Sequence, residues 1–227
     1  MAYRIGTQKE GKRMNLPNKI TISRIILIVA MIVAMLVLAF IPDFVAPDLG
    51  NSGINLVYLI FACVFVIAAF TDYLDGHIAR KYNLVTNFGK FLDPIADKLL
   101  NDGLMIFLLV PQAYALSQRR DPLALSILMI CVIVMIARDL VVDALRLIAV
   151  QKGDVIAANM FGKAKTVLQM IAIPMLLLND WPFRYFDHSW PEALQISNIF
   201  FYLATIMSLI SGIIYLVQNH KVLKETK

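Results

Sequence analysis

Residues 54–80 read INLVYLIFACVFVIAAFTDYLDGHIAR and place a long apolar run directly before a group of charged residues. The run from Ile54 to Thr71 has no charged side chain, and a helix needs about 20 mostly apolar residues to cross the hydrocarbon core of a bilayer. Asp72, Asp75 and Arg80 follow it at once. The stretch therefore predicts a membrane-spanning helix whose last turns carry carboxylates at one edge of the bilayer.

The composition of the whole chain agrees with a membrane protein. The 227 residues are 59% hydrophobic and 16% charged, against roughly 45–50% and 25% in average soluble domains. Such a chain is too apolar to be disordered, and a water-soluble globule could not bury so much apolar surface. Cys63 and Cys131 lie inside apolar runs, so the sequence offers neither a disulfide framework nor a zinc-ligand spacing.

Further charge-free runs have the same character as the first, with apolar residues on all sides rather than at a 3.6-residue period. The sequence predicts an all-α, polytopic membrane protein with six transmembrane helices in one domain over residues 15–220. We expect residues 15–24, NLPNKITISR, to form a short N-terminal interfacial helix that Asn18 or Thr21 can cap. Residues 1–14 are then an N-terminal extension and residues 221–227 a cytoplasmic tail. The expected spans are 20–42, 54–80, 90–117, 122–151, 162–180 and 194–218.

The distribution of basic residues predicts the orientation. Six spans place both chain ends on one side of the membrane. Of the 21 Lys and Arg residues, 18 fall on that side, and the other side carries only Arg119, Arg120 and Arg184. The positive-inside rule then puts both termini and the carboxylates in the cytoplasm.

Four carboxylates are predicted to converge at the cytoplasmic edge. Asp72 and Asp75 are three residues apart, and Asp93 and Asp97 are four apart, so each pair lies on one helical face. The two helices are joined by a short loop and must lie side by side. Four carboxylates at close range repel one another and are costly to desolvate. A purely structural alternative pairs each of them with a nearby basic side chain, namely Arg80, Lys90 or Lys98.

A divalent metal centre is the stronger interpretation of these carboxylates. An oxygen-only donor set suits Mg²⁺, Mn²⁺ or Ca²⁺ rather than zinc, and four carboxylates can hold the two ions that suit chemistry at phosphorus. Gly76 and Ala79 are small and let a ligand approach the helix, while Arg80 offers a cation to a phosphate. The sequence has no glycine-rich phosphate loop, which excludes a P-loop nucleotidase.

Two further groups of charges predict a second phosphate site. Residues 137–146 read ARDLVVDALR, and charges inside a span usually face the bundle interior or a watery cavity. Lys163 and Lys165 stand at the start of the next span, where a helix N-terminus with two lysines can bind an anion. The alternatives are ordinary positive-inside flanking for the lysines and internal ion pairs for the other group. Those pairs would join Arg138 to Asp139 or Asp143, and Asp143 to Arg146.

The carboxylate pattern resembles the signature of the CDP-alcohol phosphotransferase family, D-x2-D-G-x2-A-R-x8-G-x3-D-x3-D. All spacings agree over residues 72–97, and a chance match is on the order of 10⁻¹⁰ per starting position. Within the family, residues 15 to about 217 resemble the bacterial phosphatidylglycerophosphate synthases. Asp139 stands where Glu is usual in that branch, and Asp143 where Gly is usual. The signature positions are Asp72, Asp75, Gly76, Ala79, Arg80, Gly89, Asp93 and Asp97.

The resemblance implies a metal-dependent transferase. It would move the phosphatidyl group of CDP-diacylglycerol to the primary hydroxyl of sn-glycerol-3-phosphate, giving phosphatidylglycerophosphate and CMP. Two Mg²⁺ (or Mn²⁺) ions per active site would be held by the four Asp, with Asp97 as general base. The resemblance also implies a homodimer in the bacterial cytoplasmic membrane. The implied CDP-diacylglycerol contacts are Asp72, Gly76, Ala79, Arg80, Asn18 and Thr21, and the implied acceptor-phosphate contacts are Arg138, Lys163, Lys165 and Arg146.

Two kinds of rival stay open from the sequence. One is another branch of the family, of the cardiolipin or inositol-phosphate type; the lysine pair favours a phosphorylated acceptor and so counts against serine and free inositol. The other is a cation transporter that uses the carboxylates as an ion path. Transporters often place such groups near the bilayer midplane in repeated halves, whereas here they cluster at one edge and no repeat is evident.

Overall fold

The computed structural model describes residues 15–41, 47, 49–50, 54–82, 86–109, 121–154, 156–157, 159–187 and 189–220. These residues fold almost entirely into helices. The predicted extension 1–14 and the tail 221–227 lie outside them. The elements are α1 (Leu16–Phe40), α2 (Leu56–Lys81), α3 (Asn87–Phe107), α5 (Pro122–Gln151), α6 (Met160–Leu177), α7 (Arg184–Asp187), the 3₁₀ turn η2 (Glu192–Leu194) and α8 (Ile196–Gln218).

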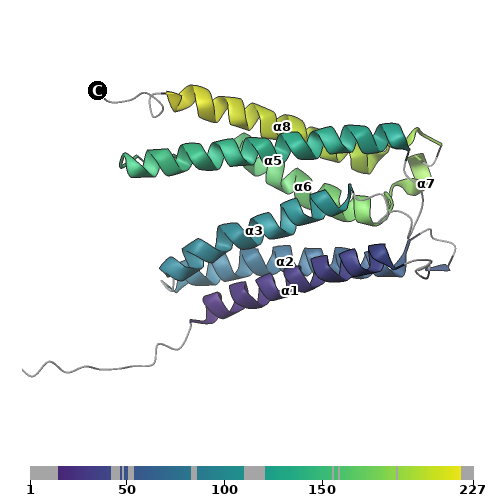
Figure 1. The fold of residues 1–227 in the computed structure, drawn as a ribbon, viewed down its shortest axis with the longest axis horizontal. Coiled ribbons are helices and arrows are strands. Elements are labelled where there is room, and N and C mark those ends of the chain that lie inside the picture. Colours follow the sequence, from purple (N-terminus) through teal and green to yellow (C-terminus); the bar gives the residue numbers. More distant parts are fainter. Residues whose placement is uncertain are drawn as a thin grey trace, which may run out of the picture.

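The long helices form two groups that run along a common direction (Figure 1). In one group α1 packs against α2 and α3, and in the other α8 packs against α5 and α6. Contacts between α2 and α6 join the two groups, whereas α3 touches α5 and α6 only sparsely. The start of α1 and the end of α8 lie at the same end of the molecule.

Five of the helices are long and apolar enough to cross a membrane, namely α1, α2, α5, α6 and α8. The all-α membrane fold is therefore confirmed. The predicted third span, 90–117, corresponds to α3, which ends at Phe107 with Leu108 as its C-cap and carries several charges in its first half. The count of six spans stays a prediction, because residues 110–117 lie outside the described part of the chain.

The predicted short interfacial helix is wrong. Residues 16–24 form the first turns of α1, which runs unbroken from Leu16 to Phe40. Pro17 lies in the first turn, where a missing N–H does no harm, and no helix-breaking residue follows it. Asn18 and Thr21 thus lie inside a long helix and do not cap a short one, since Asn15 holds the N-cap position and makes no side-chain cap bond.

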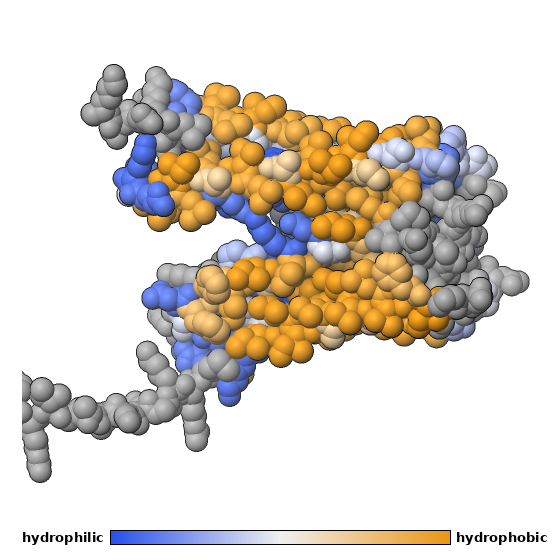
Figure 2. Space-filling view, viewed as in Figure 1, coloured by the Kyte–Doolittle hydropathy of each residue, from blue (hydrophilic) through white to orange (hydrophobic). Residues whose placement is uncertain are grey.

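The two helix groups share an apolar core, and their outer surface is apolar as well. Phe65 and Phe201, from different helix groups, belong to one continuous buried cluster. The outer surface is also apolar over most of its length, as Figure 2 shows. Figure 2 shows in addition that the two groups separate toward the end where α1 begins, and that hydrophilic side chains line the hollow between them. The molecule therefore presents apolar surface to lipid and a polar cleft at one end.

Candidate functional site

The carboxylate cluster, by which we mean Asp72, Asp75, Asp93 and Asp97, lies at the polar end of α2 and α3. Asp72 and Asp75 occupy the last turns of α2, and the other two occupy the first turns of α3. Asp75 is buried, with 3% of the residue exposed, whereas the side chains of Asp72 and Asp93 are 41% and 49% exposed. The cluster therefore has one buried member and an open side.

A single basic side chain from α1 bridges three members of this cluster. Arg24 forms an ion pair with Asp72 through Nη1. The same nitrogen lies 3.9 Å from Asp75 Oδ2, and Nη2 lies 3.9 Å from Asp93 Oδ1. Carboxylates from two helices thus reach one cation. The sequence suggested Arg80, Lys90 and Lys98 as partners of the carboxylates, and not Arg24.

The residues present fit a hard divalent ion. They supply oxygen donors only, and three of the carboxylates already reach one cation. As the described side chains stand, no three acidic groups lie close enough together to bind one metal ion, and Arg24 lies among them. A metal ion at this cluster would therefore require the carboxylates to come closer together than they lie here.

Asn18 and Thr21 of α1 lie beside the cluster. The Thr21 hydroxyl is 3.2 Å from Asp75 Oδ2 and 3.3 Å from Asp93 Oδ1. Asn18 Oδ1 accepts a hydrogen bond of 2.8 Å from Thr86 Oγ1 at the N-cap of α3. A Cβ atom added at Gly89 would lie 3.1 Å from Asn18 Oδ1. The motif glycine thus allows α3 to approach α1 closely at this point.

Gly76 and Ala79 follow the cluster on α2, as the sequence predicted. Arg80 belongs to the same helix, but its side chain lies outside the described part of the structure, as does that of Lys90. The predicted contact between Arg80 and a substrate phosphate therefore stays a prediction.

A polar pocket of about 250 Å³ lies next to the cluster. It is bounded by α3, α5, α6 and α8, and Asp97 belongs to its wall. The Asp97 carboxylate accepts a hydrogen bond of 2.8 Å from Asn101 Nδ2. Asp97 is thus the point at which the carboxylate cluster and the pocket meet. The four predicted acceptor-phosphate residues all line this pocket, namely Arg138, Arg146, Lys163 and Lys165.

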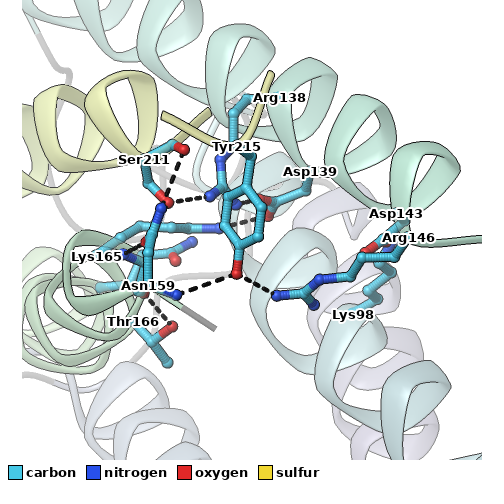
Figure 3. A network of polar contacts seen from close by, with 12 residues as sticks. Lys98, Arg138, Asp139, Asp143, Arg146, Asn159, Lys165, Thr166, Ser211 and Tyr215 are labelled. Carbon is cyan, nitrogen blue, oxygen red and sulfur yellow. Dashed lines mark hydrogen bonds and ion pairs between the residues drawn. The ribbon is translucent and has the colours of Figure 1, made fainter. Parts of the chain in front are cut away.

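Arg138 of α5 lies at the pocket, where residues of α5 and α8 hold its guanidinium (Figure 3). Its Nη1 donates to Asp139 Oδ1 at 2.8 Å, and its Nη2 donates to Ser211 Oγ. A Cβ atom at Gly212 would lie 2.9 Å from Arg138 Cγ, so the glycine makes room for the arginine stem. The guanidinium also lies 5.7 Å from the centre of the Tyr215 ring.

The internal ion pairs considered from the sequence are present in part. Arg138 pairs with Asp139, which also pairs with Lys165. Asp143 pairs with Lys98 of α3 and not with Arg146. Arg146 instead donates to the Tyr215 hydroxyl at 2.6 Å. The pocket wall holds five basic and four acidic side chains, a surplus of one positive charge. Much of its basic character is therefore already balanced within the protein.

Several polar residues of this wall were not predicted from the sequence. Tyr215 accepts from Arg146 and from the Asn159 amide at 3.2 Å, and donates to Ala157 O at 3.1 Å. Asn159 accepts from Ser211 Oγ at 2.7 Å and caps α6. The sequence of α8 does contain a signal for a polar helix face, because polar or small residues recur three to four positions apart in an otherwise apolar run. They are Ser208, Ser211, Gly212 and Tyr215.

The chain is similar to known proteins over most of its length. The profile of the CDP-alcohol phosphatidyltransferase family matches residues 14–216. A Bacillus subtilis protein named CDP-diacylglycerol–glycerol-3-phosphate 3-phosphatidyltransferase is 41% identical over 210 residues, covering 92% of this chain and 97% of its own. Proteins of the same name from Mycoplasma pneumoniae and Rickettsia bellii are 36% identical over 220 and 204 residues, covering 92% and 88% of this chain and 89% and 93% of their own. Members of the family depend in general on divalent metal ions. The chain belongs to the CDP-alcohol phosphatidyltransferase family.

Proposed function

We propose that this membrane protein transfers the phosphatidyl group of CDP-diacylglycerol to the primary hydroxyl of sn-glycerol-3-phosphate. The products are phosphatidylglycerophosphate and CMP. One observation carries the choice of acceptor: a pocket with a positive surplus, large enough for a small phosphate ester, opens beside Asp97 of the carboxylate cluster. The names of the relatives support the same reaction.

The carboxylate cluster is the proposed site for the donor's pyrophosphate. Asp72, Asp75, Asp93 and Asp97 would hold two Mg²⁺ or Mn²⁺ ions, which when bound neutralise the charge of the phosphates and of the departing CMP. The small residues Gly76 and Ala79 leave space beside the helix for the nucleotide. Arg80, Asn18 and Thr21 are the further donor contacts in this proposal.

The pocket is the proposed site for the water-soluble acceptor. Its phosphate is a dianion and needs basic groups. In the wall of the pocket α5 supplies Arg138 and Arg146, and α6 supplies Lys163 and Lys165. Because Lys165 and Arg138 both contact Asp139, the phosphate must share them with that carboxylate. Asp139 thereby orients both cations when no acceptor is present.

Asp97 is the proposed general base. It takes the proton of the primary hydroxyl, whose oxygen forms a bond to the phosphorus that bears the diacylglycerol. The bond from that phosphorus to the bridging oxygen of the pyrophosphate breaks, and CMP leaves with the electron pair. Help of this kind is typically worth about 10²–10⁴-fold in rate. Asn101, which donates to the carboxylate, fixes its orientation.

The proposed setting is the bacterial cytoplasmic membrane, with termini and active site facing the cytoplasm. The uneven distribution of basic residues supports that orientation, and the cleft lies at the end where α1 begins and α8 ends. A homodimer with one site per chain belongs to the same proposal.

The test is CMP release from CDP-diacylglycerol by the purified protein with Mg²⁺. Glycerol-3-phosphate, an inositol phosphate and phosphatidylglycerol are offered separately, with an EDTA-treated sample of each. Release with glycerol-3-phosphate alone, abolished by EDTA and restored by Mg²⁺, is the expected result. Release with a different acceptor would contradict the proposed pocket role, and release that survives EDTA would contradict the proposed metal centre.

A further inference from the structure

We propose that Arg24 is a built-in counter-cation of the carboxylate cluster, which holds the cluster together without metal and which a divalent ion displaces on binding. The inference rests on the proposed function, because it takes the cluster as the metal site. It assigns to Arg24 a positioning role: the residue acts through the aspartates and regulates how tightly the metal binds.

The first support is the placement of Arg24. The residue is 3% exposed, eight residues into α1 and on the face that meets α2 and α3. A charged group buried at the edge of the hydrocarbon is costly unless it is paired. Arg24 reaches Asp72 and Asp75 on α2 and Asp93 on α3. One guanidinium therefore neutralises part of the mutual repulsion of three carboxylates and links the ends of both helices.

The second support is that the pairing is incomplete. A guanidinium carries five N–H donors, and buried donors are normally all hydrogen-bonded. Nε and Nη2 of Arg24 are buried and have no hydrogen-bond partner among the described atoms, since Asp93 lies at 3.9 Å. Arg138 also has a buried Nε without a partner, but both of its Nη nitrogens are hydrogen-bonded, so Nη2 is the donor that distinguishes Arg24. Arg24 thus keeps N–H donors that its contacts with the carboxylates do not satisfy, as expected of a group that can be displaced.

The third support is competition for the same oxygens. A metal ion held by Asp72 needs the carboxylate lone pairs that Arg24 now occupies, and like charges repel at this range. Thr21 contacts Asp75 and Asp93 through a neutral hydroxyl and imposes no such conflict. The Arg24 contact and a bound ion therefore compete for Asp72. Removal of the positive charge should strengthen metal binding and weaken the metal-free state.

The test measures Mn²⁺ affinity without substrate, by the electron paramagnetic resonance of free Mn²⁺ over the purified full-length protein in detergent. Arg24→Gln removes the charge, and Arg24→Met does so while keeping an apolar stem suited to the buried position. Both should bind Mn²⁺ about 10-fold more tightly than wild type. Mn²⁺ should also raise their thermal unfolding midpoint by more than it raises that of wild type. Arg24→Lys keeps the charge and should stay within about threefold of wild type.

Two controls separate this inference from the proposed metal site. Lys19→Gln removes an exposed cation from the same helix and should leave the Mn²⁺ affinity unchanged, while Asp75→Asn should weaken it. Unchanged or weaker binding in both neutral Arg24 variants, with saturable binding in wild type, would overturn the counter-cation role alone. If wild type shows no saturable binding, or Asp75→Asn binds as wild type does, the metal site itself is wrong.

Discussion

Asp97 is the residue on which both halves of the proposed reaction depend. It belongs to the carboxylate cluster by its motif position and to the acceptor pocket by its place in the wall. Asp97→Asn keeps an oxygen that can accept from Asn101 but removes the basic carboxylate. We expect CMP release to fall by about 10²–10⁴-fold or more, with the fold intact by circular dichroism. Asp154→Asn, at an exposed position past the end of α5, is the matched control and should keep full activity.

Lys165 is the buried member of the basic wall. It is 7% exposed and pairs with Asp139. Lys165→Gln should raise the KM for glycerol-3-phosphate by about 10- to 100-fold, because a hydrogen bond to a charged group is worth about 1.5–3 kcal/mol. The KM for CDP-diacylglycerol should stay near its wild-type value. Steady-state kinetics with each substrate varied in turn measure both, and an equal rise in the two KM values would contradict a role in the acceptor site.

Lys152→Gln is the control for that variant, because Lys152 is exposed beyond the last turn of α5. It removes the same charge from the same end of the molecule. A matching rise in its KM for glycerol-3-phosphate would mean that the long-range charge of this end, rather than the pocket, attracts the acceptor.

Single functional residues could be predicted from the sequence where their spacing forms a recognisable motif. The four aspartates stand out because carboxylates are rare next to an apolar span. Arg24 could not be recognised in the same way, since a basic residue near the end of a span is ordinary positive-inside charge. Only the start of α1 at Leu16 shows that Arg24 lies two turns inside the helix and faces the other carboxyl-bearing helices.

Between elements, one ion pair crosses the cleft from α3 to α5. Lys98 pairs with Asp143, which stands where the resembling branch usually has Gly. Asp143→Ala removes a negative charge from the pocket wall and releases a lysine toward it. We expect the KM for glycerol-3-phosphate to fall about 2- to 5-fold, as befits a half-exposed pair worth at most about 1 kcal/mol. Lys98→Ala should shift the same constant in the opposite direction, and a shift of equal sign in both variants would contradict this electrostatic account.

The helices themselves were largely predictable. Charge-free runs gave α2, α5, α6 and α8 within a few residues of their observed bounds. Helix starts were harder to predict, because apolarity shows where a helix crosses lipid but not where it begins in the polar layer. Residues 16–24 join α1 without a break, and α3 begins at Asn87 behind the Thr86 cap, ahead of its apolar half. The polar face of α8 was missed because a few hydroxyl groups hardly change the mean hydropathy of a 23-residue helix.

Considered as a whole, the molecule has a second polar centre at the end away from the cleft. Asp180 Oδ1 accepts from the Ser197 amide at 2.6 Å, and Asp187 Oδ2 accepts from the Ile196 amide at 2.9 Å. Both carboxyl groups thus lie at the N-terminus of α8, and both residues are at most 1% exposed. Burial and the neighbouring carboxyl group of Asp187 raise the pKa of Asp180 to about 6.

This raised pKa predicts a pH dependence of stability. The folded state binds the Asp180 proton more tightly than the unfolded state does, because the pKa of an unperturbed Asp in the unfolded chain is about 3.9. The stabilising contribution is therefore complete below the unfolded pKa and is lost as the pH rises through about 6. The thermal unfolding midpoint in detergent should be a few degrees higher at pH 5 than at pH 7.5. Asp180→Asn should reduce that difference, and an unchanged difference in the variant would contradict this source of the pH dependence.

The apolar outer surface and the cleft between the two helix groups (Figure 2) also determine how the proposed donor arrives. A nucleotide lipid cannot leave the bilayer to reach the cluster; it diffuses sideways until its headgroup enters the opening, with its acyl chains still in the leaflet. The quantity that saturates the enzyme is then the mole fraction of the donor among the surrounding lipids, not its amount per volume of solution. Diluting the donor with inert lipid at constant total donor should slow turnover, whereas adding buffer should not.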